Sequence, residues 1–239
     1  MTPDGTADRT AQISAGLAAV RTRIDAARLA AGRTDDVELV VVTKTFPASD
    51  VDILAALGIT DVAENRDQEA RAKAEACAPA AVGLRWHMIG QLQRNKAASV
   101  ARWADVVEAV DRPEIADALG RAASKEGRVL EVLLQVALDL DPRDDRGGVP
   151  PTAAMALAER VVGQPGLVLR GVMGVAPYPG DPQEAFGRLQ AVSEELRERW
   201  PQADRISAGM SGDLEQAVAN GATQVRIGGA VLGQRSSVQ

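Results

Sequence analysis

Lys44 is the residue of this sequence whose position points most directly to chemistry. It ends the segment Leu39-Val40-Val41-Val42-Thr43-Lys44, whose apolar and β-branched residues are typical of a buried strand. The other three lysines, Lys73, Lys96 and Lys125, lie in polar stretches with a helical pattern, where an ammonium group is easily solvated. An amine at the end of a buried strand loses its proton more readily, and a neutral amine attacks an aldehyde to form a Schiff base.

Residues near the C-terminal end have the types that hold a phosphate. Arg226 is followed by Gly228 and Gly229, and adjacent glycines let a ligand approach backbone N–H groups closely. Ser211 and Gly212 precede a segment with a helical pattern, and the amides at the start of a helix favour an anion. Ser211 is also expected to cap that helix, whether or not a ligand binds there.

Each of these residues also has a purely structural interpretation. The two glycines could serve tight strand packing or a turn, and Arg226 could pair with a carboxylate across the fold. His87 is the only histidine, and a lone histidine among apolar residues is more often a hydrogen-bonded core residue than a catalyst. One histidine, one cysteine and scattered carboxylates give no recognisable set of metal ligands, so no metal is predicted.

Strand and helix patterns alternate along the chain. Ile13, Leu17, Val20 and Ile24 predict an opening amphipathic helix that Gly32 ends. The strands are expected to begin near Val37, Asp61, Leu84, Val106, Arg128, Leu167, Asp204 and Gln224. The clearest helices between them are predicted over residues 48–57, 66–77, 92–103, 113–125, 152–162, 182–200 and 213–220.

This order predicts an α/β fold: a single (β/α)8 TIM-type barrel with an extra N-terminal helix. A doubly wound open sheet is the competing architecture, because periodicity alone does not distinguish a closed sheet from an open one. In a barrel the carboxyl ends of all strands meet at one rim. The residues expected there are Lys44, Glu64, Asn65, residues 87–90, Asp111, Met210, Ser211 and residues 226–229. Ser211, Gly228 and Gly229 would then form a phosphate cradle on the same rim as Lys44. A lysine that forms a Schiff base, facing such a cradle, suits pyridoxal 5′-phosphate (PLP), which carries both an aldehyde and a phosphate.

Composition limits the remaining function classes. The 239 residues carry a net charge of −6, which argues against nucleic acid and anionic membranes as partners. Cys77 is alone, so no intramolecular disulfide is expected. The first nine residues lack an apolar signal core and no run reaches the length of a membrane span, so we expect a cytoplasmic protein. Residues 1–239 are predicted to form one domain with its core at about 36–233, and residues 139–148 a charged loop.

Six separated motifs resemble the pyridoxal phosphate homeostasis proteins, single-domain relatives of alanine racemase. The resemblance covers residues 36–233 and rests on Val42–Pro47, Glu64–Arg66, Trp86–Lys96, Leu169–Met173, Gly209–Ser211 and Val225–Gly228. It implies that Lys44 carries the cofactor as a Schiff base, that Ser211, Gly228 and Gly229 hold the phosphate, and that Arg226 faces the pyridine nitrogen. Asn65, His87 and Met210 match motif positions that line the same pocket.

The sequence departs from the family pattern at three places. Gly229 stands where the family has threonine, which removes a hydroxyl from the phosphate cradle and is expected to lower phosphate affinity. Gly212 stands where aspartate is common. The loop 139–148 lacks the lysine often found there, and whether Arg143 or Arg146 takes its place is left open.

Arg226 also bears on whether the pocket catalyses a reaction. A cation opposite the pyridine nitrogen disfavours its protonation, and an unprotonated ring is a poorer sink for a carbanion. Alanine racemase adds a tyrosine base from a further domain, whereas the sole tyrosine here, Tyr178, lies in a Pro-Gly-rich loop and is expected to be a turn residue. We therefore expect a non-enzymatic, monomeric PLP carrier that serves vitamin B6 homeostasis and supplies PLP-dependent apo-enzymes. The alternatives are a PLP-dependent racemase or related fold-type III enzyme and a cofactor-free Schiff-base aldolase.

Overall fold

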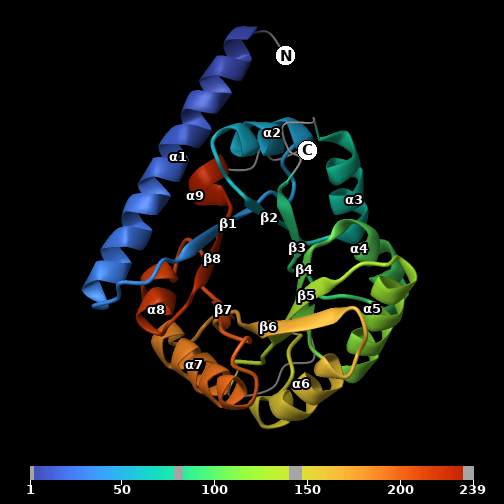
Figure 1. Cartoon of the computed structure of the whole chain (residues 1–239). Helices are drawn as coiled ribbons and strands as arrows, with labels where there is room; N and C mark the ends of the chain where they lie inside the picture. Colours follow the sequence, from blue (N-terminus) through green and yellow to red (C-terminus); the bar gives the residue numbers. More distant parts are fainter. Residues whose placement is uncertain (1–2, 78–82, 140–146, 234–239) are drawn as a thin grey trace.

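Eight parallel strands form a closed barrel in which each strand pairs with its neighbours in sequence order. The computed structural model describes residues 3–77, 83–139 and 147–233. Figure 1 looks along the barrel, with the strands around the centre and the helices outside them. The strands are β1 (Glu38–Val42), β2 (Asp61–Glu64), β3 (Arg85–Met88), β4 (Val106–Val110), β5 (Leu130–Gln135), β6 (Leu167–Met173), β7 (Arg205–Ser207) and β8 (Gln224–Ile227).

The helices follow the strands in turn. They are α1 (Pro3–Ala30), α2 (Ala48–Ala56), α3 (Asp67–Ala76), η2 (Arg94–Lys96), α4 (Ala97–Trp103), α5 (Pro113–Lys125), η3 (Pro151–Ala153), α6 (Ala154–Val162), α7 (Pro182–Arg199), α8 (Leu214–Ala219) and α9 (Gly229–Leu232). The predicted barrel is confirmed, because β1 pairs with β8 from Glu38↔Gln224 to Val41↔Ile227 and leaves no open edge. The short helix α9 was not predicted.

The main hydrophobic core lies between the outer face of the barrel and the helices. Strand residues such as Val41, Val62 and Val107 are completely buried there against helix residues such as Leu54 and Leu119. The interior of the barrel differs from the layers of branched aliphatic residues that usually fill this fold. It holds two small apolar clusters, formed by Val40, Val42 and Ala63 and by Val106, Leu133 and Met173, together with several buried polar side chains.

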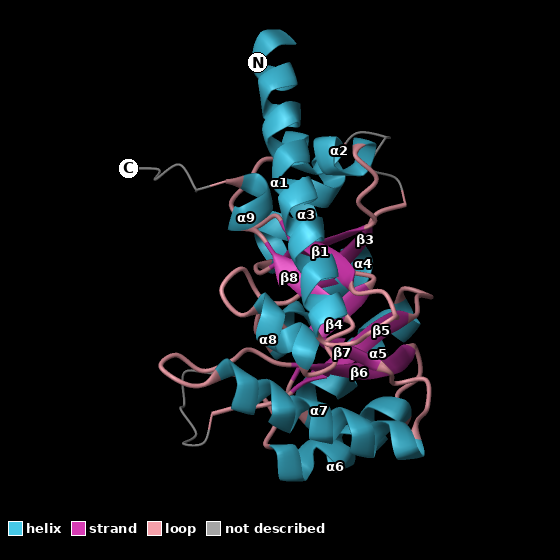
Figure 2. Cartoon of the chain, turned by 90° about the vertical axis from the view of Figure 1, so that its left-hand side faces the viewer, coloured by secondary structure: helices cyan, strands magenta, loops and turns pink. Residues whose placement is uncertain are grey.

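Helix α1 packs along the outside of the ring, against α8 and α9 (Figures 1 and 2). Ile13, Leu17 and Val20 of its predicted apolar face are almost fully buried. At Gly16 the contact with α9 is so close that a Cβ atom would lie 2.5 Å from the backbone oxygen of Val231. The helix that opens the sequence therefore supports the segment that follows β8.

The Gly16→Ala substitution is expected to destabilise the fold by about 1–3 kcal/mol, because the added methyl group forces α1 and α9 apart. The Gly187→Ala substitution in α7 is a matched control, since the nearest atom to its Cβ would be 3.5 Å away. There alanine should be neutral or stabilise the helix by up to about 1 kcal/mol. Urea unfolding of both variants measures the difference, and equal midpoints would contradict the α1–α9 contact.

Candidate functional site

Lys44 lies two residues beyond the end of β1 and is half-buried. Side chains alternate across a strand, so Lys44 follows Val40 and Val42 on the inner face of the barrel. Thr43 points outward, where its Oγ1 donates to Glu64 Oε1 at 2.6 Å. Thr45 has a φ of 69°, an unusual value for a residue other than glycine, and its N–H donates to Glu69 Oε1 at 2.5 Å. The backbone on both sides of Lys44 is thus held by contacts to β2 and α3.

Lys44 lines a cavity of about 300 Å³ at the rim of the barrel. The lining residues come from the ends of β1 and β8 and from the segments after β1, β3, β7 and β8: Val42, Lys44, Phe46, Ile89, Met210, Ser211, Gly212, Arg226, Gly228 and Gly229. Six of the eight residues predicted for the site are among them, namely Lys44, Met210, Ser211, Arg226, Gly228 and Gly229. Ile89 belongs to residues 87–90, which were expected at the rim but not assigned to the cofactor. Phe46 was missed, because it follows the turn at Lys44 and Thr45, where the alternation of side chains along β1 has ended.

The two glycines after Arg226 differ in the space that surrounds them. A Cβ at Gly228 would lie 3.0 Å from the carbonyl oxygen of Val42, so glycine here allows β8 to approach β1 closely. A Cβ at Gly229 or at Gly212 would meet no atom within 4 Å. The space in front of both backbone segments is therefore open, and a bulky anion can reach them.

Ser211 does not cap helix α8, which corrects one prediction. The helix begins at Leu214 and its N-cap residue is Asp213, whose Oδ1 accepts a hydrogen bond of 2.6 Å from the N–H of Met210. Ser211 is exposed in the turn before it and lines the cavity. A residue in such a turn is free to contact a ligand, because its hydroxyl is not needed to satisfy the helix.

Arg226 forms part of the cavity wall and is only 4% exposed. Its Nη1 donates to Ser207 Oγ at 2.6 Å and its Nη2 to the carbonyl oxygen of Gly174 at 2.9 Å. Burial lowers the pKa of Arg226, whereas the nearby carboxylates of Glu108 and Asp213 raise it. An arginine remains protonated under such conditions, so the cavity contains one fixed, oriented cation.

Two residues predicted for the site lie elsewhere. His87 is completely buried inside the barrel, and its ring nitrogens contact carboxylate oxygens of Glu108 and Asp61 at 2.7 and 2.9 Å. Asn65 lines a second rim cavity of about 460 Å³, and its carbonyl oxygen abuts Gly90, where a Cβ would be only 2.0 Å away. The structure thus gives His87 the role of a hydrogen-bonded core residue, as its apolar sequence neighbours indicated.

Lys73 is buried, contrary to the expectation that its ammonium group is solvated. Its Nζ donates to the carbonyl oxygen of Thr43 at 2.7 Å and forms ion pairs with Glu64 and, at 3.2 Å, with Glu69. Burial raises the pKa of Glu64, and the hydrogen bonds from Lys73 and Thr43 oppose that rise. This second lysine near the rim is therefore occupied by structural contacts.

The sequence predicted neither a metal site nor a membrane-spanning helix, and it left open the role of the charged loop. Within residues 3–77, 83–139 and 147–233, no group of histidine, cysteine, aspartate and glutamate side chains could hold a metal ion. No helix in the described part of the chain is both long and apolar enough to cross a membrane. Arg143 and Arg146 fall in residues 140–146, which lie outside the described residues.

Comparisons with known proteins agree with this fold. Residues 16–236 match the family model of the alanine racemase N-terminal domain. A pyridoxal phosphate homeostasis protein of Mycobacterium tuberculosis is 44% identical over 246 residues, covering 95% of each chain. The crystal structure of a Bifidobacterium adolescentis protein of unknown function superposes with a TM-score of 0.87 at 30% identity, covering 94% of this chain and 96% of that one. PipY of Synechococcus elongatus, whose structure has PLP bound, superposes with a TM-score of 0.80 at 31% identity, covering 92% of this chain and all of PipY.

Proposed function

This chain belongs to the pyridoxal phosphate homeostasis protein family and carries the alanine racemase N-terminal domain, and we propose that it binds PLP and takes part in intracellular vitamin B6 homeostasis. The observation that carries the proposal is that Lys44, Arg226 and the open backbone at Gly229 line one cavity. A reactive amine, a fixed cation and accessible amides suit the aldehyde, the ring nitrogen and the phosphate of PLP, respectively.

Lys44 is proposed as the covalent anchor. Its neutral amine attacks the aldehyde carbon, a C=N bond replaces the C=O bond, and water leaves. The reaction is reversible by hydrolysis, which a carrier needs if it is to release its ligand. Lys73 is held by the carbonyl of Thr43 and two carboxylates, and Lys96 lines the other cavity, so Lys44 is the lysine placed for this reaction.

The phosphate is proposed to bind at Ser211, Gly228 and Gly229, with Met210 beside it. These residues belong to the two segments that follow β7 and β8, and β8 is the strand that pairs with β1, the strand before Lys44. Asn65 and His87, which were predicted to contact PLP, are not proposed as direct contacts, because they occupy the neighbouring cavity and the barrel interior.

We propose that PLP is held without catalytic turnover. Arg226 places a buried cation in the cavity wall. A pyridine nitrogen that faced it, as the family resemblance implies, would be disfavoured from taking up a proton, and the ring would stabilise a carbanion poorly. Tyr178, the sole tyrosine, is 90% exposed in the loop after β6. A tyrosine so exposed to solvent is poorly suited to act as the second base of a racemase. A PLP-dependent racemase is the second candidate, and release of the α-proton of an added amino acid into deuterated water would favour it.

We further propose a domain organisation, an oligomeric state, a location and recipients of PLP for this protein. Residues 1–239 act as one PLP-binding domain, as a monomer and in the cytoplasm, and PLP-dependent apo-enzymes receive the ligand. Mixing the PLP-loaded protein with an apo-aminotransferase tests the last point. Reactivation faster than the release of PLP into a trapping reagent supports direct delivery, whereas equal rates mean that PLP passes through solution.

Mass mapping after borohydride reduction tests the covalent anchor directly. Trypsin does not cleave after a modified lysine, so a reduced adduct on Lys44 yields one peptide of residues 34–66 with the added mass of the ligand. An unmodified Lys44 yields residues 34–44 and 45–66. An adduct found only on another lysine, or none after incubation with PLP, would refute the proposal.

The Gly229→Thr substitution is expected to tighten PLP binding by up to about tenfold, since it adds a hydroxyl group worth about 0.5–1.5 kcal/mol beside the phosphate. The open space at Gly229 accommodates the side chain. Gly229→Val is the matched control, because valine has the same shape without the hydroxyl group. Fluorescence titration with PLP measures both affinities, and equal affinities in the two variants would place the phosphate elsewhere.

A further inference from the structure

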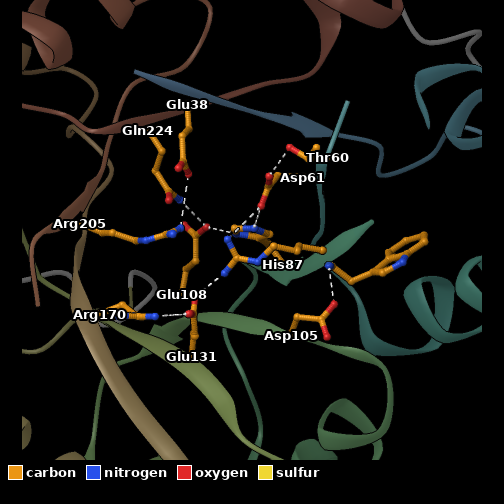
Figure 3. Close-up of polar contacts among 12 residues, drawn as sticks. Glu38, Thr60, Asp61, His87, Asp105, Glu108, Glu131, Arg170, Arg205 and Gln224 are labelled. Atoms are coloured by element: carbon orange, nitrogen blue, oxygen red, sulfur yellow. Dashed lines mark hydrogen bonds and ion pairs between the residues drawn. The ribbon is translucent and has the colours of Figure 1, made fainter. Parts of the chain in front are cut away.

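A chain of buried polar side chains connects Arg226 with the interior of the barrel. Figure 3 shows the part of it in which His87 lies between Asp61 and Glu108. Ser207 Oγ donates to Glu108 Oε2 at 2.6 Å, and the Oε1 of the same glutamate contacts His87 Nδ1 at 2.7 Å. His87 Nε2 contacts Asp61 Oδ1 at 2.9 Å. These residues come from β2, β3, β4, β7 and β8 and are at most 9% exposed. Side chains from five strands thus form one hydrogen-bonded unit.

The donors around Glu108 fix its ionisation state. Ser207 Oγ accepts from Arg226 Nη1 at 2.6 Å, so its own hydrogen goes to Glu108. Gln224 Nε2 donates to Glu108 Oε1 at 2.8 Å. An ionised carboxylate only accepts hydrogen bonds, and every neighbour of Glu108 is able to donate. Glu108 is therefore a carboxylate, and His87 Nδ1 donates to it.

The other nitrogen of His87 faces a second carboxylate. Asp61 accepts a hydrogen bond of 2.7 Å from Thr60 Oγ1, and its Oδ1 lies 3.5 Å from Arg85 Nη1, which favours its ionised form. A neutral imidazole carries one N–H, so one of its two nitrogens would direct a lone pair at a carboxylate. Only an imidazolium donates from both nitrogens.

We propose that His87 is held as an imidazolium between Asp61 and Glu108, and that this buried cation is a positioning residue that fixes Glu108 and, through Glu108 and Ser207, orients Arg226 in the cavity. Its effect on bound PLP rests on the function proposed above, whereas its protonation state does not. His87 thus supports Arg226 from inside the barrel and does not line the cavity wall.

The charges along the barrel interior alternate in sign. We call the series of contacting charged side chains the charged column. In contact order it consists of the cation Arg85, the anion Asp61, the cation His87, the anion Glu108 and the cation Arg226. The remaining charged groups that face this column are Glu131, which pairs with Arg85 and with Arg170 at 2.7 Å, and Glu38, which pairs with Arg205 at 3.4 Å. Asp213 adds a further negative charge near Arg226. Every cation of the column has an anionic neighbour.

The pKa directions agree with this assignment. Burial by itself lowers the pKa of His87, but the hydrogen bonds to Asp61 and Glu108 outweigh it, and the net pKa is raised. Burial raises the pKa of Glu108 and of Asp61, and in both cases the contact with His87 contributes most to a net lowering. The three groups therefore stabilise one another in their charged forms.

Nuclear magnetic resonance of the protein without PLP tests the protonation state, because His87 is the only histidine of the chain. The protein is purified with an affinity tag that lacks histidine and labelled with ¹⁵N-histidine. We expect both ring nitrogens to show the shifts of N–H groups from pH 6 to pH 8, and the Glu108→Gln variant to titrate at least about one pH unit lower. A neutral imidazole spectrum at pH 7 in the wild-type protein would overturn the proposal.

The positioning role is tested by the absorbance of the PLP-loaded protein as a function of pH. We expect His87→Gln to shift the midpoint of this titration by at least about one unit, because Arg226 loses its orientation. Trp86→Phe is the matched control, since this neighbour lies on the opposite face of β3 and contacts the outer core. Equal midpoints in His87→Gln and wild-type protein would refute the positioning role. A protein that binds no PLP at all would refute the proposed function and leave the resonance result unaffected.

Discussion

The Lys44→Ala variant is expected to lose all covalent attachment of PLP while its free energy of unfolding stays within about 1 kcal/mol of the wild-type value. The side chain is half-buried at the rim, outside the packed layers between the barrel and its helices. Its amine is the one placed in the cavity with Arg226. The phosphate contacts remain in the variant, so weak non-covalent binding should persist and disappear on dialysis.

Borohydride reduction followed by mass spectrometry of the intact protein measures this loss. The Lys96→Ala variant serves as the control, because that lysine side chain is 47% exposed and lines the neighbouring cavity. It should retain the full adduct. An adduct of unchanged yield in Lys44→Ala would mean that another lysine carries PLP, and the proposed anchor would be wrong.

Most of the fold could be predicted from the sequence, because apolar strand patterns and helical patterns alternate with a short period. Every strand begins within two residues of its predicted start. Closure of the barrel could not be derived from periodicity and followed from the number of strands and the family resemblance. Helix α9 was missed because Gly228 and Gly229 indicate flexible backbone, whereas the contact of α1 with Val231 holds this segment as a helical turn.

The site was predictable where its residues follow the strands, since the ends of parallel strands converge. That rule places Lys44 and Arg226 at one edge of the sheet, and closure of the barrel, which pairs β1 with β8, brings them into one cavity. Glu108 was never singled out, because one carboxylate in the segment Val106–Val110 resembles an ordinary solvated residue. Lys73 was misjudged for the same reason. Both are explained by partners distant in sequence, such as Gln224 for Glu108 and Thr43 for Lys73, which no local pattern reveals.

The polar interior distinguishes this barrel from one whose interior is filled with aliphatic side chains. Apolar packing lies mainly outside the strands, and the interior holds the charged column that ends at Arg226. Replacing a buried ion pair by apolar residues is often neutral, whereas removing one partner is strongly destabilising. The column is therefore best explained by the orientation that it imposes on the cavity cation.

The Glu108→Gln variant is expected to lose about 3–5 kcal/mol of stability near pH 6, because His87 and Arg226 then remain buried without the anion between them. Glu108 is completely buried, so water cannot compensate for the lost charge. Glu114→Gln on α5 is the control, because Glu114 is exposed and its removal should change stability by less than about 0.5 kcal/mol. Urea unfolding followed by fluorescence gives both values.

The pH dependence of this loss provides a sharper test than its size. The lowered pKa of Glu108 means that its contribution is present above the ordinary value of 4.5 and is lost as the pH falls through the native pKa. The raised pKa of His87 means that its contribution is complete below 6.5 and is lost as the pH rises through the native pKa. The difference between wild-type and Glu108→Gln protein should therefore be largest between about pH 4.5 and 6.5 and decrease on both sides. A difference that stays constant from pH 4 to pH 9 would show that Glu108 acts by packing alone and that His87 does not depend on its charge.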